Sequence, residues 1–373
     1  MKTKEQEKLT WAIIGGGNGG QSMAGHMGIM GFPVRLYDIF PDTIEAIKSQ
    51  GGIKVEGEVE GFGKLEFATT KINEVLDGAD IIIVVAPALA HRAIAKDCAP
   101  HLKDGQVVVL HPGSTFGALE FKQVLEEENC TSNVVIAETE SLIYACRSVK
   151  PGHVNILGIK GSLKTAAIPA NKTEMVVELL NTAYPQMYPG SNVMEISLGN
   201  LNAMMHPAPT LLNTSLIESV HDWLYYWDGI TPSIGKYVEE MDKERLSIVK
   251  ALGLNSVDVL ENYKIYYNAE APTLSEAVKK NEAYGGVKGQ KSLNTRYVLE
   301  DIPMGLVPIV SLGKMLGLDV SRMETIVKLG EQLLDKDFTK TGRTVESLGL
   351  SDMTVEEMMS YVETGIRGKI ALA

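Results

Sequence analysis

The sequence predicts an α/β Rossmann-like doubly wound parallel sheet followed by an all-α C-terminal domain. From Trp11 to about Pro189, short apolar runs alternate with amphipathic segments, which is the pattern of parallel βαβ units. After about residue 190 the apolar residues recur with a 3.6-residue period, and runs of β-branched residues become rare. We therefore expect an α/β domain over residues 1–190 and a helical domain over residues 191–373.

The strands of the α/β domain are predicted from short runs of apolar and β-branched residues that are bounded by turns. The expected strands cover residues 11–15, 33–38, 81–86, 106–111, 133–139, 153–161 and 165–170. Four of them come before any long departure from the βαβ alternation. That number is sufficient to predict a doubly wound sheet.

Helix boundaries in the second half follow from proline, glycine and capping residues. One helix is expected over residues 233–253, because Pro232 precedes it and Gly253 ends it. Thr273 with Glu276, and Thr354 with Glu357, have the spacing of a capping box and indicate two further helix starts.

Charge and hydropathy exclude several classes of partner. The chain of 373 residues has 35 Lys and Arg against 47 Asp and Glu, a net charge of −12 that disfavours binding to nucleic acid or to an anionic membrane. The longest apolar run, Ile81 to Ala90, is about half as long as a membrane span. The first ten residues are charged and lack the apolar segment of a signal peptide. We therefore expect a cytoplasmic protein that binds small polar molecules, and we keep a homodimer as a hypothesis.

Cysteine and histidine spacing predicts neither a disulfide framework nor a metal site. Three cysteines are too few for such a framework in a chain of this length, which indicates a reducing compartment. His91, His101 and His111 recur at intervals of ten, which fits no helical face and no common ligand spacing. We therefore predict no metal.

A glycine-rich turn after the first strand predicts a dinucleotide-binding loop. Gly15, Gly17 and Gly20 have the G-x-G-x-x-G spacing, directly after a strand and before the amphipathic segment GQSMAGHMGIMG, and Asn18 lies within this loop as a further candidate cofactor contact. The first glycine allows a tight turn, the second lets a pyrophosphate approach the backbone, and the third allows close packing of helix on strand. Asp38 follows the second strand, 23 residues after Gly15, where a carboxylate accepts hydrogen bonds from ribose hydroxyls. The alternative is a glycine-rich turn that only packs.

The residues around Asp38 favour NAD over NADP. A carboxylate repels a 2′-phosphate, and the stretch IFPDT after Asp38 contains no Arg or Lys. Arg35 is a nearby cation, but strand alternation places it on the opposite face from Asp38.

A histidine interrupts an apolar helical pattern over residues 198–216. Pro207 and Pro209 follow His206 and remove two backbone hydrogen bonds, so a kink is expected there. One hypothesis is that the kink directs His206 into a cleft between the two domains, where an imidazole can exchange a proton at neutral pH. The alternative is a buried histidine that bonds to the freed carbonyls or to Asn202.

Several stretches of the chain resemble the opine dehydrogenases, the octopine and nopaline dehydrogenase family. The glycine loop and the segments APALAHRAIAKDCAPHLKDGQVVVLHPG and ETESLIYACR carry part of the similarity. The segments GNLNAMMHPAPTLLN, WDGITPSIG and KSLNTRYVLEDIPMGLVP are more specific to that family. The resemblance implies an NADH-dependent condensation of an amino acid with a 2-oxo acid such as pyruvate, through an imine, to a secondary-amine dicarboxylate.

The resemblance also implies roles for individual residues. His206 of the MMHP stretch is similar to the family's general acid/base, and Asp301 of RYVLEDIP to its partner. Arg296 resembles the clamp for the 2-oxo acid, and Cys146 resembles a substrate-lining position. Each has a structural alternative: Asp301 as a helix N-cap, Arg296 as an ion pair with Glu300, and Cys146 as a buried inert thiol.

Some further features are interpreted from the residues alone. Glu140, near the end of a strand, is a candidate contact for the substrate amino group. The aromatic stretch 223–227 is a candidate lining of the amino-acid pocket, with packing against the helical core as the favoured role. The stretch YGGVKGQ at 284–290 is expected to be flexible, and closure over substrate is one hypothesis for it. Ser114 and Ile143 stand where the family often has Arg and Pro, which leaves substrate and cofactor detail open.

Two other functions are compatible with a two-domain dinucleotide-binding chain. One is a reductase of the ketopantoate or glycerol-3-phosphate type, families that place a lysine where this chain has His206. Phosphate substrates would also require more clustered basic residues than this chain offers. The other is a nucleotide-sensing protein without turnover.

Overall fold

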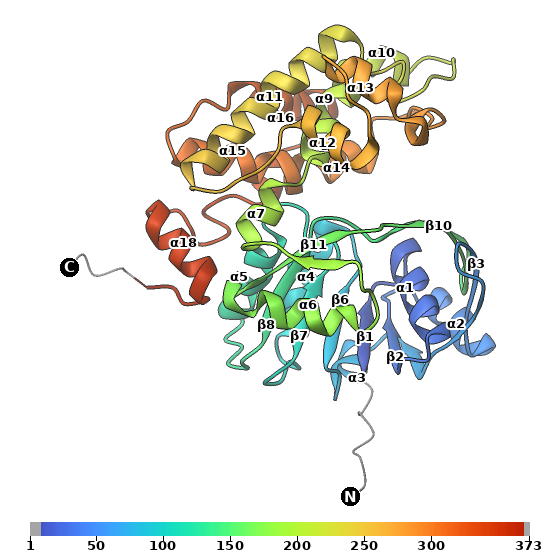
Figure 1. Ribbon diagram of the computed structural model, residues 1–373. Helices are drawn as coiled ribbons and strands as arrows, with labels where there is room; N and C mark the ends of the chain where they lie inside the picture. The colour runs from blue at the N-terminus through green and yellow to red at the C-terminus, as the bar shows by residue number, and fades with distance from the viewer. Residues whose placement is uncertain (1–8, 369–373) are drawn as a thin grey trace, which may run out of the picture. The chain divides into compact units, whose positions relative to one another are not determined.

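The computed structural model describes residues 9–368, and the chain divides into two compact units. Unit 1 contains the described residues as far as Ile196 together with those from Glu356 on, and unit 2 contains Ser197–Val355 (Figure 1). The expected helical domain over residues 191–373 therefore differs from unit 2 at its C-terminal end, because the chain returns to unit 1 after Val355.

The return is held by contacts between helix α18 (Val355–Thr364) and helix α5 (Gly117–Glu127). The Tyr361 hydroxyl donates to Glu126 Oε1 at 3.3 Å, and Arg367 Nε donates to Glu126 Oε2 at 2.8 Å. The Arg367 guanidinium lies 4.3 Å from the centre of the Tyr361 ring. A cation over a buried aromatic ring adds to the ion pair, so this helix is anchored to unit 1.

Unit 1 is built on an eight-stranded sheet in the order β12-β11-β8-β7-β6-β1-β2-β5. Its strands are β1 (Trp11–Ile14), β2 (Val34–Tyr37), β5 (Phe67–Thr69), β6 (Ile81–Val84), β7 (Val107–Leu110), β8 (Val135–Thr139), β11 (Leu163–Ile168) and β12 (Met187–Pro189). From β5 to β8 all neighbouring strands are parallel, which confirms the predicted doubly wound sheet. The strand order reverses between β1 and β6, and doubly wound sheets bind ligands at that position.

Two of the expected strands depart from the parallel βαβ series. Strand β11 runs antiparallel to β8. Residues expected as the strand 153–161 form β10 (His153–Ile159), which belongs to a second sheet. That sheet has the order β4-β3-β10-β9, with β3 (Gly52–Gly57), β4 (Gly61–Lys64) and β9 (Tyr144–Lys150).

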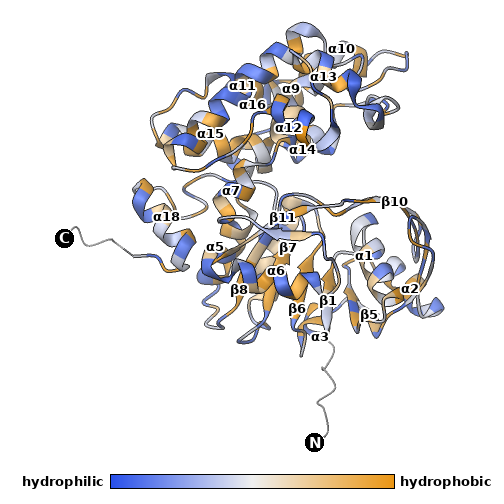
Figure 2. Cartoon of the chain, viewed as in Figure 1, coloured by the Kyte–Doolittle hydropathy of each residue, from blue (hydrophilic) through white to orange (hydrophobic). Residues whose placement is uncertain are grey.

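Helices cover both faces of the large sheet. On one face, Ile13 and Val109 share a buried cluster with residues of α1 (Asn18–Ile29), α2 (Pro41–Gln50) and α6 (Thr173–Asn181), and with the small sheet. Strand alternation directs Leu110 to the other face, where Gly117 of α5 lies against its side chain. The remaining helices of this unit are α3 (Ile72–Leu76), η1 (Ala88–Ala90), α4 (His91–Cys98) and η2 (Ala170–Lys172). In Figure 2, strand β6 is orange, as expected for a strand buried on both faces.

Helix α7 (Val193–Leu198) spans the boundary between the units, and all other regular elements of unit 2 are helical. They are α8 (Asn202–Met205), α9 (Pro207–Leu212), α10 (Thr214–Ile217), α11 (Pro232–Ala251), α12 (Val259–Tyr267), α13 (Leu274–Lys280), η3 (Glu282–Tyr284), α14 (Arg296–Leu299), the π-helical turn η4 (Ile302–Leu306), α15 (Val307–Met315), α16 (Ser321–Leu334) and α17 (Phe338–Thr341). Helix α11 confirms the helix expected over residues 233–253. Within residues 9–368, no helix is both long and apolar enough to cross a membrane.

The two predicted capping boxes fall at helix starts, although Thr273 does not make the expected capping hydrogen bond. Thr273 directly precedes α13, but its hydroxyl donates to the Glu276 carboxylate at 2.9 Å and caps no backbone N–H. Helix α18 begins directly after Thr354. Helix position was therefore predictable from these residues, and the detailed capping bond at Thr273 was not.

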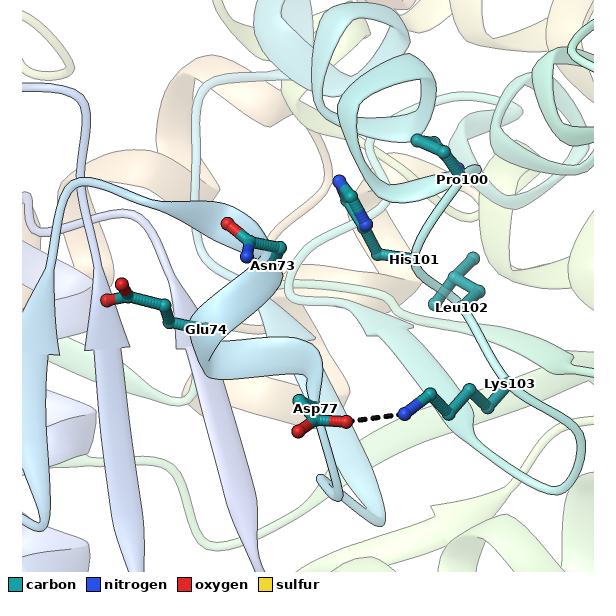
Figure 3. A pocket seen from close by; sticks show the side chains of 7 residues that line it. All are labelled: Asn73, Glu74, Asp77, Pro100, His101, Leu102 and Lys103. Atoms are coloured by element: carbon teal, nitrogen blue, oxygen red, sulfur yellow. Dashed lines mark hydrogen bonds and ion pairs between the residues drawn. The ribbon is translucent and has the colours of Figure 1, made fainter.

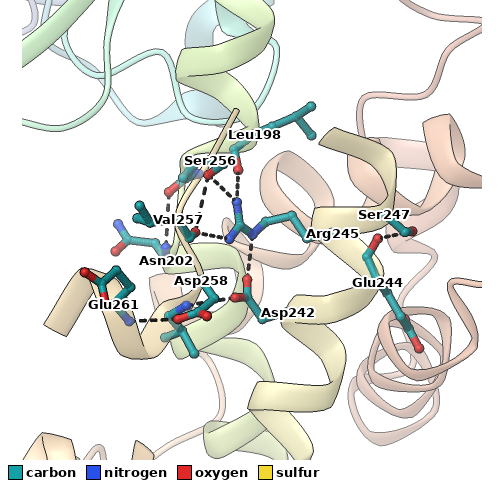
Figure 4. A network of polar contacts seen from close by, with 12 residues as sticks. Leu198, Asn202, Asp242, Glu244, Arg245, Ser247, Ser256, Val257, Asp258 and Glu261 are labelled. Atoms are coloured by element: carbon teal, nitrogen blue, oxygen red, sulfur yellow. Dashed lines mark hydrogen bonds and ion pairs between the residues drawn. The ribbon is translucent and has the colours of Figure 1, made fainter. Parts of the chain in front are cut away.

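A buried arginine joins several segments of unit 2 (Figure 4). Arg245 and Asp242 of α11 are fully buried and form an ion pair with an Nε to Oδ1 distance of 2.6 Å. The guanidinium also donates to the carbonyls of Leu198 and Val257, each at 2.8 Å. Because a buried guanidinium must have its N–H groups bonded, this cluster fixes the end of α7 and the segment before α12 against α11.

Candidate functional site

The glycine loop after β1 is shaped by two close backbone approaches. Gly15 has a φ of +110°, and a Cβ there would lie 2.3 Å from the Val85 carbonyl oxygen at the end of β6. A Cβ on Gly20 would lie 1.7 Å from the Gly15 carbonyl oxygen. Both positions therefore exclude a side chain, in agreement with the turn and packing roles predicted for these two glycines.

The middle glycine of the loop has open space in front of it. A Cβ on Gly17 would meet no atom within 4 Å, and its φ of −75° is accessible to any residue. Gly17 and Asn18 are exposed, whereas Gly16, Gly19 and Gly20 are buried. Gly17 precedes the first residue of α1, where backbone N–H groups and the helix dipole favour an anion. The geometry fits a pyrophosphate approaching the backbone at Gly17.

Asn18 and Asp38 hold this loop in place. The Asn18 side-chain oxygen accepts from the Ser148 N–H of β9 at 3.0 Å. Asp38 Oδ2 accepts from the Gly16 N–H, and Oδ1 accepts from the Phe40 N–H at 2.8 Å. A carboxylate offers about four lone-pair positions, so Asp38 keeps acceptor capacity for ribose hydroxyls while it binds the loop.

Arg35 is engaged away from Asp38. Its Nε donates to Glu66 Oε2 at 2.8 Å, and a terminal nitrogen donates to the Asp77 carbonyl oxygen. These partners agree with the opposite strand face predicted for Arg35. The guanidinium is thus already paired with protein acceptors.

The helical pattern over residues 198–216 is broken at His206. The chain forms α8 up to Met205 and α9 from Pro207, with His206 between them at φ −105° and ψ −57°. The predicted kink is thus a break into short helices. The Tyr225 hydroxyl lies 3.2 Å from the Met205 carbonyl oxygen, the acceptor that Pro209 leaves without its helical donor. It also lies 2.9 Å from the His206 carbonyl oxygen.

The His206 side chain is paired with Asp301. Its Nδ1 lies 2.8 Å from Asp301 Oδ2, and the two side chains are only 11% and 13% exposed. Ionised Asp301 can accept only, so Nδ1 carries the hydrogen and Nε2 is the nitrogen free to exchange a proton. Among the residues that the structure describes, no group bonds Nε2. The alternative of a histidine bonded to freed carbonyls or to Asn202 is not what the structure shows.

Asp301 reaches His206 from the residue before the π-helical turn η4. It occupies the N-cap position of η4, but its carboxylate makes no capping hydrogen bond. The turn contains an i to i+5 bond from the Leu306 N–H to the Asp301 carbonyl oxygen at 3.0 Å. A Cβ on Gly305 would lie 3.1 Å from the Ala203 Cβ, so η4 packs tightly on α8, the helix before His206. Of the two roles considered for Asp301, its side chain serves the pairing and not the cap.

Two tyrosines surround the imidazole: Tyr225, from the aromatic stretch considered as a candidate pocket lining, and Tyr297, which the sequence analysis did not single out. The Tyr297 ring is stacked on it, with centroids 3.8 Å apart and planes at 6°. The Tyr225 ring meets it edge-on at 6.4 Å. Tyr297 precedes Asp301 by four residues, and this i, i+4 spacing in RYVLED was the signal that could have indicated a shared face.

Arg296 pairs with Glu300, as the structural alternative predicted. Its Nε donates to Glu300 Oε2, and one terminal nitrogen donates to Oε1 at 3.0 Å. The Glu300 side chain is 6% exposed and that of Arg296 is 74% exposed. Glu300 binds the edge formed by Nε and one terminal nitrogen, so the edge formed by the two terminal nitrogens is not occupied by Glu300. Pairing with Glu300 and clamping of a substrate carboxylate are therefore compatible.

Cys146 lies in the core of unit 1, on β9 of the small sheet. It is buried, and burial raises the pKa of its thiol. Thiolate formation is thus disfavoured, in line with the inert-thiol alternative. Glu140 accepts from the Lys164 N–H at 3.0 Å.

The aromatic stretch at 223–227 packs in the helical core. Trp223, Tyr225 and Tyr226 are buried, and Tyr226 stacks on Tyr284 at 4.1 Å. Two of the three glycines of YGGVKGQ are explained by close approach: a Cβ on Gly285 would lie 2.7 Å from the Trp227 ring, and one on Gly289 would lie 2.0 Å from the Trp223 ring. The Gly289 N–H also donates to the Trp223 carbonyl at 2.8 Å, so the structure ties this segment to the aromatic stretch.

Neither His111 nor the surface hollow beside His101 combines a paired imidazole with a position where dinucleotide-binding sheets bind ligands. Buried His111 accepts from the Ile143 N–H at 3.1 Å, and burial lowers its pKa to about 3. Exposed His101 lines a hollow with Asp77, Lys103 and neighbouring residues (Figure 3). This hollow lies before the amino ends of β6 and β7, whereas open α/β sheets bind ligands at the carboxyl ends. Over residues 9–368, no three His, Cys, Asp or Glu side chains are placed to hold a metal ion.

Comparison with known proteins identifies relatives along the whole chain. The family model described as the alpha-helical domain of NAD/NADP octopine/nopaline dehydrogenase matches residues 189–334. A model of the N-terminus of NAD-dependent glycerol-3-phosphate dehydrogenase matches residues 10–137. The chain is 41% identical to an opine dehydrogenase of Arthrobacter sp. (strain 1C), over 96% of this chain and 99% of that one. It is 22% identical to the octopine dehydrogenase of Pecten maximus, over 88% and 91% of the two chains.

Solved structures share the fold. A structure of octopine dehydrogenase with NADH and L-arginine aligns with a TM-score of 0.82 and 20% identity, over 97% of this chain and 99% of that one. A ketopantoate reductase from Ralstonia eutropha JMP134 aligns with a TM-score of 0.63 and 18% identity, over 88% and 99%. The two-unit architecture is therefore common to several dehydrogenases, and the octopine dehydrogenase structure matches more of it.

Substitution of two loop glycines should separate folding from dinucleotide binding. Gly17→Ala places a methyl group in open space, so we expect an unchanged melting temperature and an NADH Kd raised about tenfold or more, a loss of about 1.4 kcal/mol. Gly20→Ala drives a methyl group into the Gly15 carbonyl, so we expect a clear loss of thermal stability. Differential scanning fluorimetry and NADH fluorescence titration measure the two effects. Equal NADH affinity in wild type and Gly17→Ala would contradict the role assigned to this glycine.

Proposed function

The chain belongs to the opine dehydrogenase family, and we propose that it condenses an amino acid with a 2-oxo acid such as pyruvate, using NADH. The product is an N-(1-carboxyalkyl) amino acid formed through an imine, and the reverse oxidation uses the same groups. The observation that carries the proposal is the 2.8 Å contact between His206 Nδ1 and Asp301 Oδ2 in the helical unit. This pair supplies the proton transfers that imine formation requires.

His206 acts as the general acid and base through Nε2. Attack of a neutral amine on the 2-oxo carbon gives a carbinolamine, and loss of its hydroxyl group needs a proton. The imidazolium donates that proton from Nε2, so water leaves and the C=N bond forms. Proton transfer by a positioned side chain of this kind contributes roughly 10²–10⁴-fold to rate.

Asp301 orients the imidazole in both of its protonation states. Because Asp301 holds the hydrogen on Nδ1, Nε2 is an acceptor in neutral His206 and a donor in the imidazolium. The carboxylate lies 2.8 Å from Nδ1, so it keeps its bond to the imidazole whether Nε2 carries a proton or not, the orienting role of a carboxylate in other acid–base pairs. Asp301 therefore supports both directions of proton transfer.

Arg296 binds the carboxylate of the 2-oxo acid. A planar guanidinium forms two parallel hydrogen bonds with a carboxylate, and the Arg296 side chain is 74% exposed, with Glu300 bonded to its Nε and to one terminal nitrogen only. Glu300 holds the opposite side of the guanidinium and restricts its rotation. Cys146 is buried at 4% exposure, and its substrate-lining role stays a prediction.

The glycine loop of unit 1 binds the dinucleotide. Gly17 and Asn18 face the pyrophosphate at the start of α1, and Gly15 and Gly20 shape the turn. Asp38 accepts hydrogen bonds from the ribose hydroxyls, which favours NAD over NADP. NADH supplies the hydride that reduces the imine carbon.

Composition supports a proposal for the cellular location. Three cysteines in a chain of 373 residues support a reducing, cytoplasmic compartment. A homodimer remains our hypothesis for the oligomeric state. Size-exclusion chromatography with light scattering measures it directly.

The reaction class is tested by measuring NADH oxidation with pyruvate alone, with amino acids alone, and with both together. We expect oxidation only when a 2-oxo acid and an amine are both present, because the imine is the group reduced. A panel of amino acids then ranks the amine substrates. Oxidation by the 2-oxo acid alone, at a rate that no amine changes, would indicate the ketopantoate reductase type of activity instead.

Substitution of the paired side chains separates catalysis from binding. We expect His206→Ala to lower kcat by about 10²–10⁴-fold, since it removes the proton donor. We expect Asp301→Asn to lower kcat by up to about 10⁴-fold, since an amide can favour the wrong imidazole tautomer. NADH Kd, measured by fluorescence titration, should change less than about twofold. Near-normal turnover in both variants would contradict these roles, and NADH binding by an inactive wild type would favour a sensing protein.

Neutralising Glu300 should affect one substrate selectively. We expect Glu300→Gln to raise the KM for the 2-oxo acid about five- to tenfold with little change in the KM for NADH, because weaker charge-assisted bonds leave the Arg296 guanidinium free to rotate. Glu240→Gln is the matched control, since Glu240 pairs with Lys243 on α11 at 2.7 Å. Steady-state kinetics with each substrate varied in turn provide the measurement. A lower KM for the 2-oxo acid in Glu300→Gln would show that Glu300 competes with the substrate.

A further inference from the structure

The His206 imidazole is held at one edge by a hydrogen bond and on one face by an aromatic ring. Asp301 Oδ2 lies 2.8 Å from Nδ1. The Tyr297 ring lies 3.8 Å from the imidazole ring, with an angle of 6° between the planes. The family relation and the proton-transfer chemistry account for the first contact. Neither of them explains the stacking of Tyr297 on the imidazole.

One hydrogen bond does not determine the orientation of the imidazole plane. The ring can turn through a limited angle about its Cβ–Cγ bond without losing that hydrogen bond, because carboxylate oxygens accept over a broad range of directions. Such a turn changes the direction of the Nε2 lone pair. Proton transfer depends on that direction, since donor and acceptor must be aligned with the reacting atom. A second contact is therefore needed to fix the plane.

The Tyr297 ring is placed to supply that second contact. Tyr297 and Asp301 are four residues apart, so the same short segment approaches the imidazole at its face and at its edge. Tyr297 packs in turn against the fully buried ring of Tyr225, with centroids 5.0 Å apart and planes at 69°. The Tyr225 hydroxyl lies 2.9 Å from the His206 carbonyl oxygen. Tyr297 is thus held against a residue that also contacts the His206 backbone.

We propose that Tyr297 is a positioning residue for the reaction: its stacked ring fixes the plane of the His206 imidazole and thereby directs Nε2 at the reacting atoms. The proposal rests on the proposed function of His206 as the general acid and base. It assigns the effect to the aromatic face of Tyr297. Phenylalanine at this position therefore preserves the effect, and an aliphatic side chain removes it.

The test compares Tyr297→Phe with Tyr297→Leu in the full-length protein. We expect Tyr297→Leu to lower kcat about 10- to 100-fold, as for misplacement of a catalytic group by about 1 Å, with an NADH KM within about twofold of wild type. We expect Tyr297→Phe to keep kcat within about threefold of wild type. Tyr266→Leu is the control, since Tyr266 is an exposed residue of α12. Equal losses of kcat in the Phe and Leu variants, or normal kcat in Tyr297→Leu, would overturn the proposal.

A spectroscopic readout tests the stacking independently of turnover. In protein labelled with [13C]histidine, the His206 ring protons should resonate upfield because they lie over an aromatic face, and His206→Gln assigns the signal. The upfield position should persist in Tyr297→Phe and disappear in Tyr297→Leu. An unchanged signal in Tyr297→Leu would overturn the stacking. Wild-type protein with the shifted signal but no amine-dependent NADH oxidation would instead contradict the proposed function.

Discussion

The break of the backbone at His206 is the constraint on which the arrangement of unit 2 depends. Pro207 and Pro209 lack the N–H groups that a continuous helix would direct to the carbonyls of Ala203 and Met205. Helix α8 therefore ends before His206, and the Tyr225 hydroxyl donates a hydrogen bond to the Met205 carbonyl in place of the missing N–H. The buried Tyr225 hydroxyl therefore replaces a backbone hydrogen bond that Pro209 cannot make. Because Tyr225 is fixed in this way, it also provides the surface on which Tyr297 packs.

Adjacent carboxylates on one short segment serve two different cationic groups. Glu300 and Asp301 are neighbours in sequence, and neighbours on a helix point about 100° apart. Glu300 holds the Arg296 guanidinium, and Asp301 holds the His206 imidazole. Two carboxylates so close together, one buried and one partly buried, would repel each other if both lacked partners, and each is instead paired with a group of opposite or protonatable character. The segment RYVLED thereby supplies, within six residues, an arginine paired with Glu300, a ring stacked on His206 and a carboxylate bonded to His206.

Local sequence patterns predicted many of the helices, strands and turns, but they could not predict contacts between segments that are distant in sequence. The glycine loop, the parallel strands, α11 and the interruption at His206 each follow from spacing within a short stretch. The small sheet was missed because β4 reads GFGK and glycine is depleted in strands. Gly63 is required there by packing, since a Cβ would lie 1.9 Å from the Gly25 carbonyl of α1. The direction of β11 and the return of α18 also depend on tertiary pairing. The family resemblance named His206 and Asp301 as partners, whereas for Tyr297 the sequence offers only its i, i+4 spacing from Asp301, which does not specify the stacking on the imidazole.

Asp38 connects the shape of the glycine loop to the choice of cofactor. Its two oxygens accept from the N–H groups of Gly16 and Phe40, so the carboxylate that would bind the ribose also holds the loop that faces the pyrophosphate. A 2′-phosphate would meet this negative charge, and Arg35, a cation close in sequence, is already bonded to Glu66. Replacing Asp38 with a neutral residue would remove the repulsion but also release Gly16. Cofactor preference and loop geometry therefore cannot be changed independently at this position, and a shift towards NADP would require new acceptors for the loop as well as a new cation.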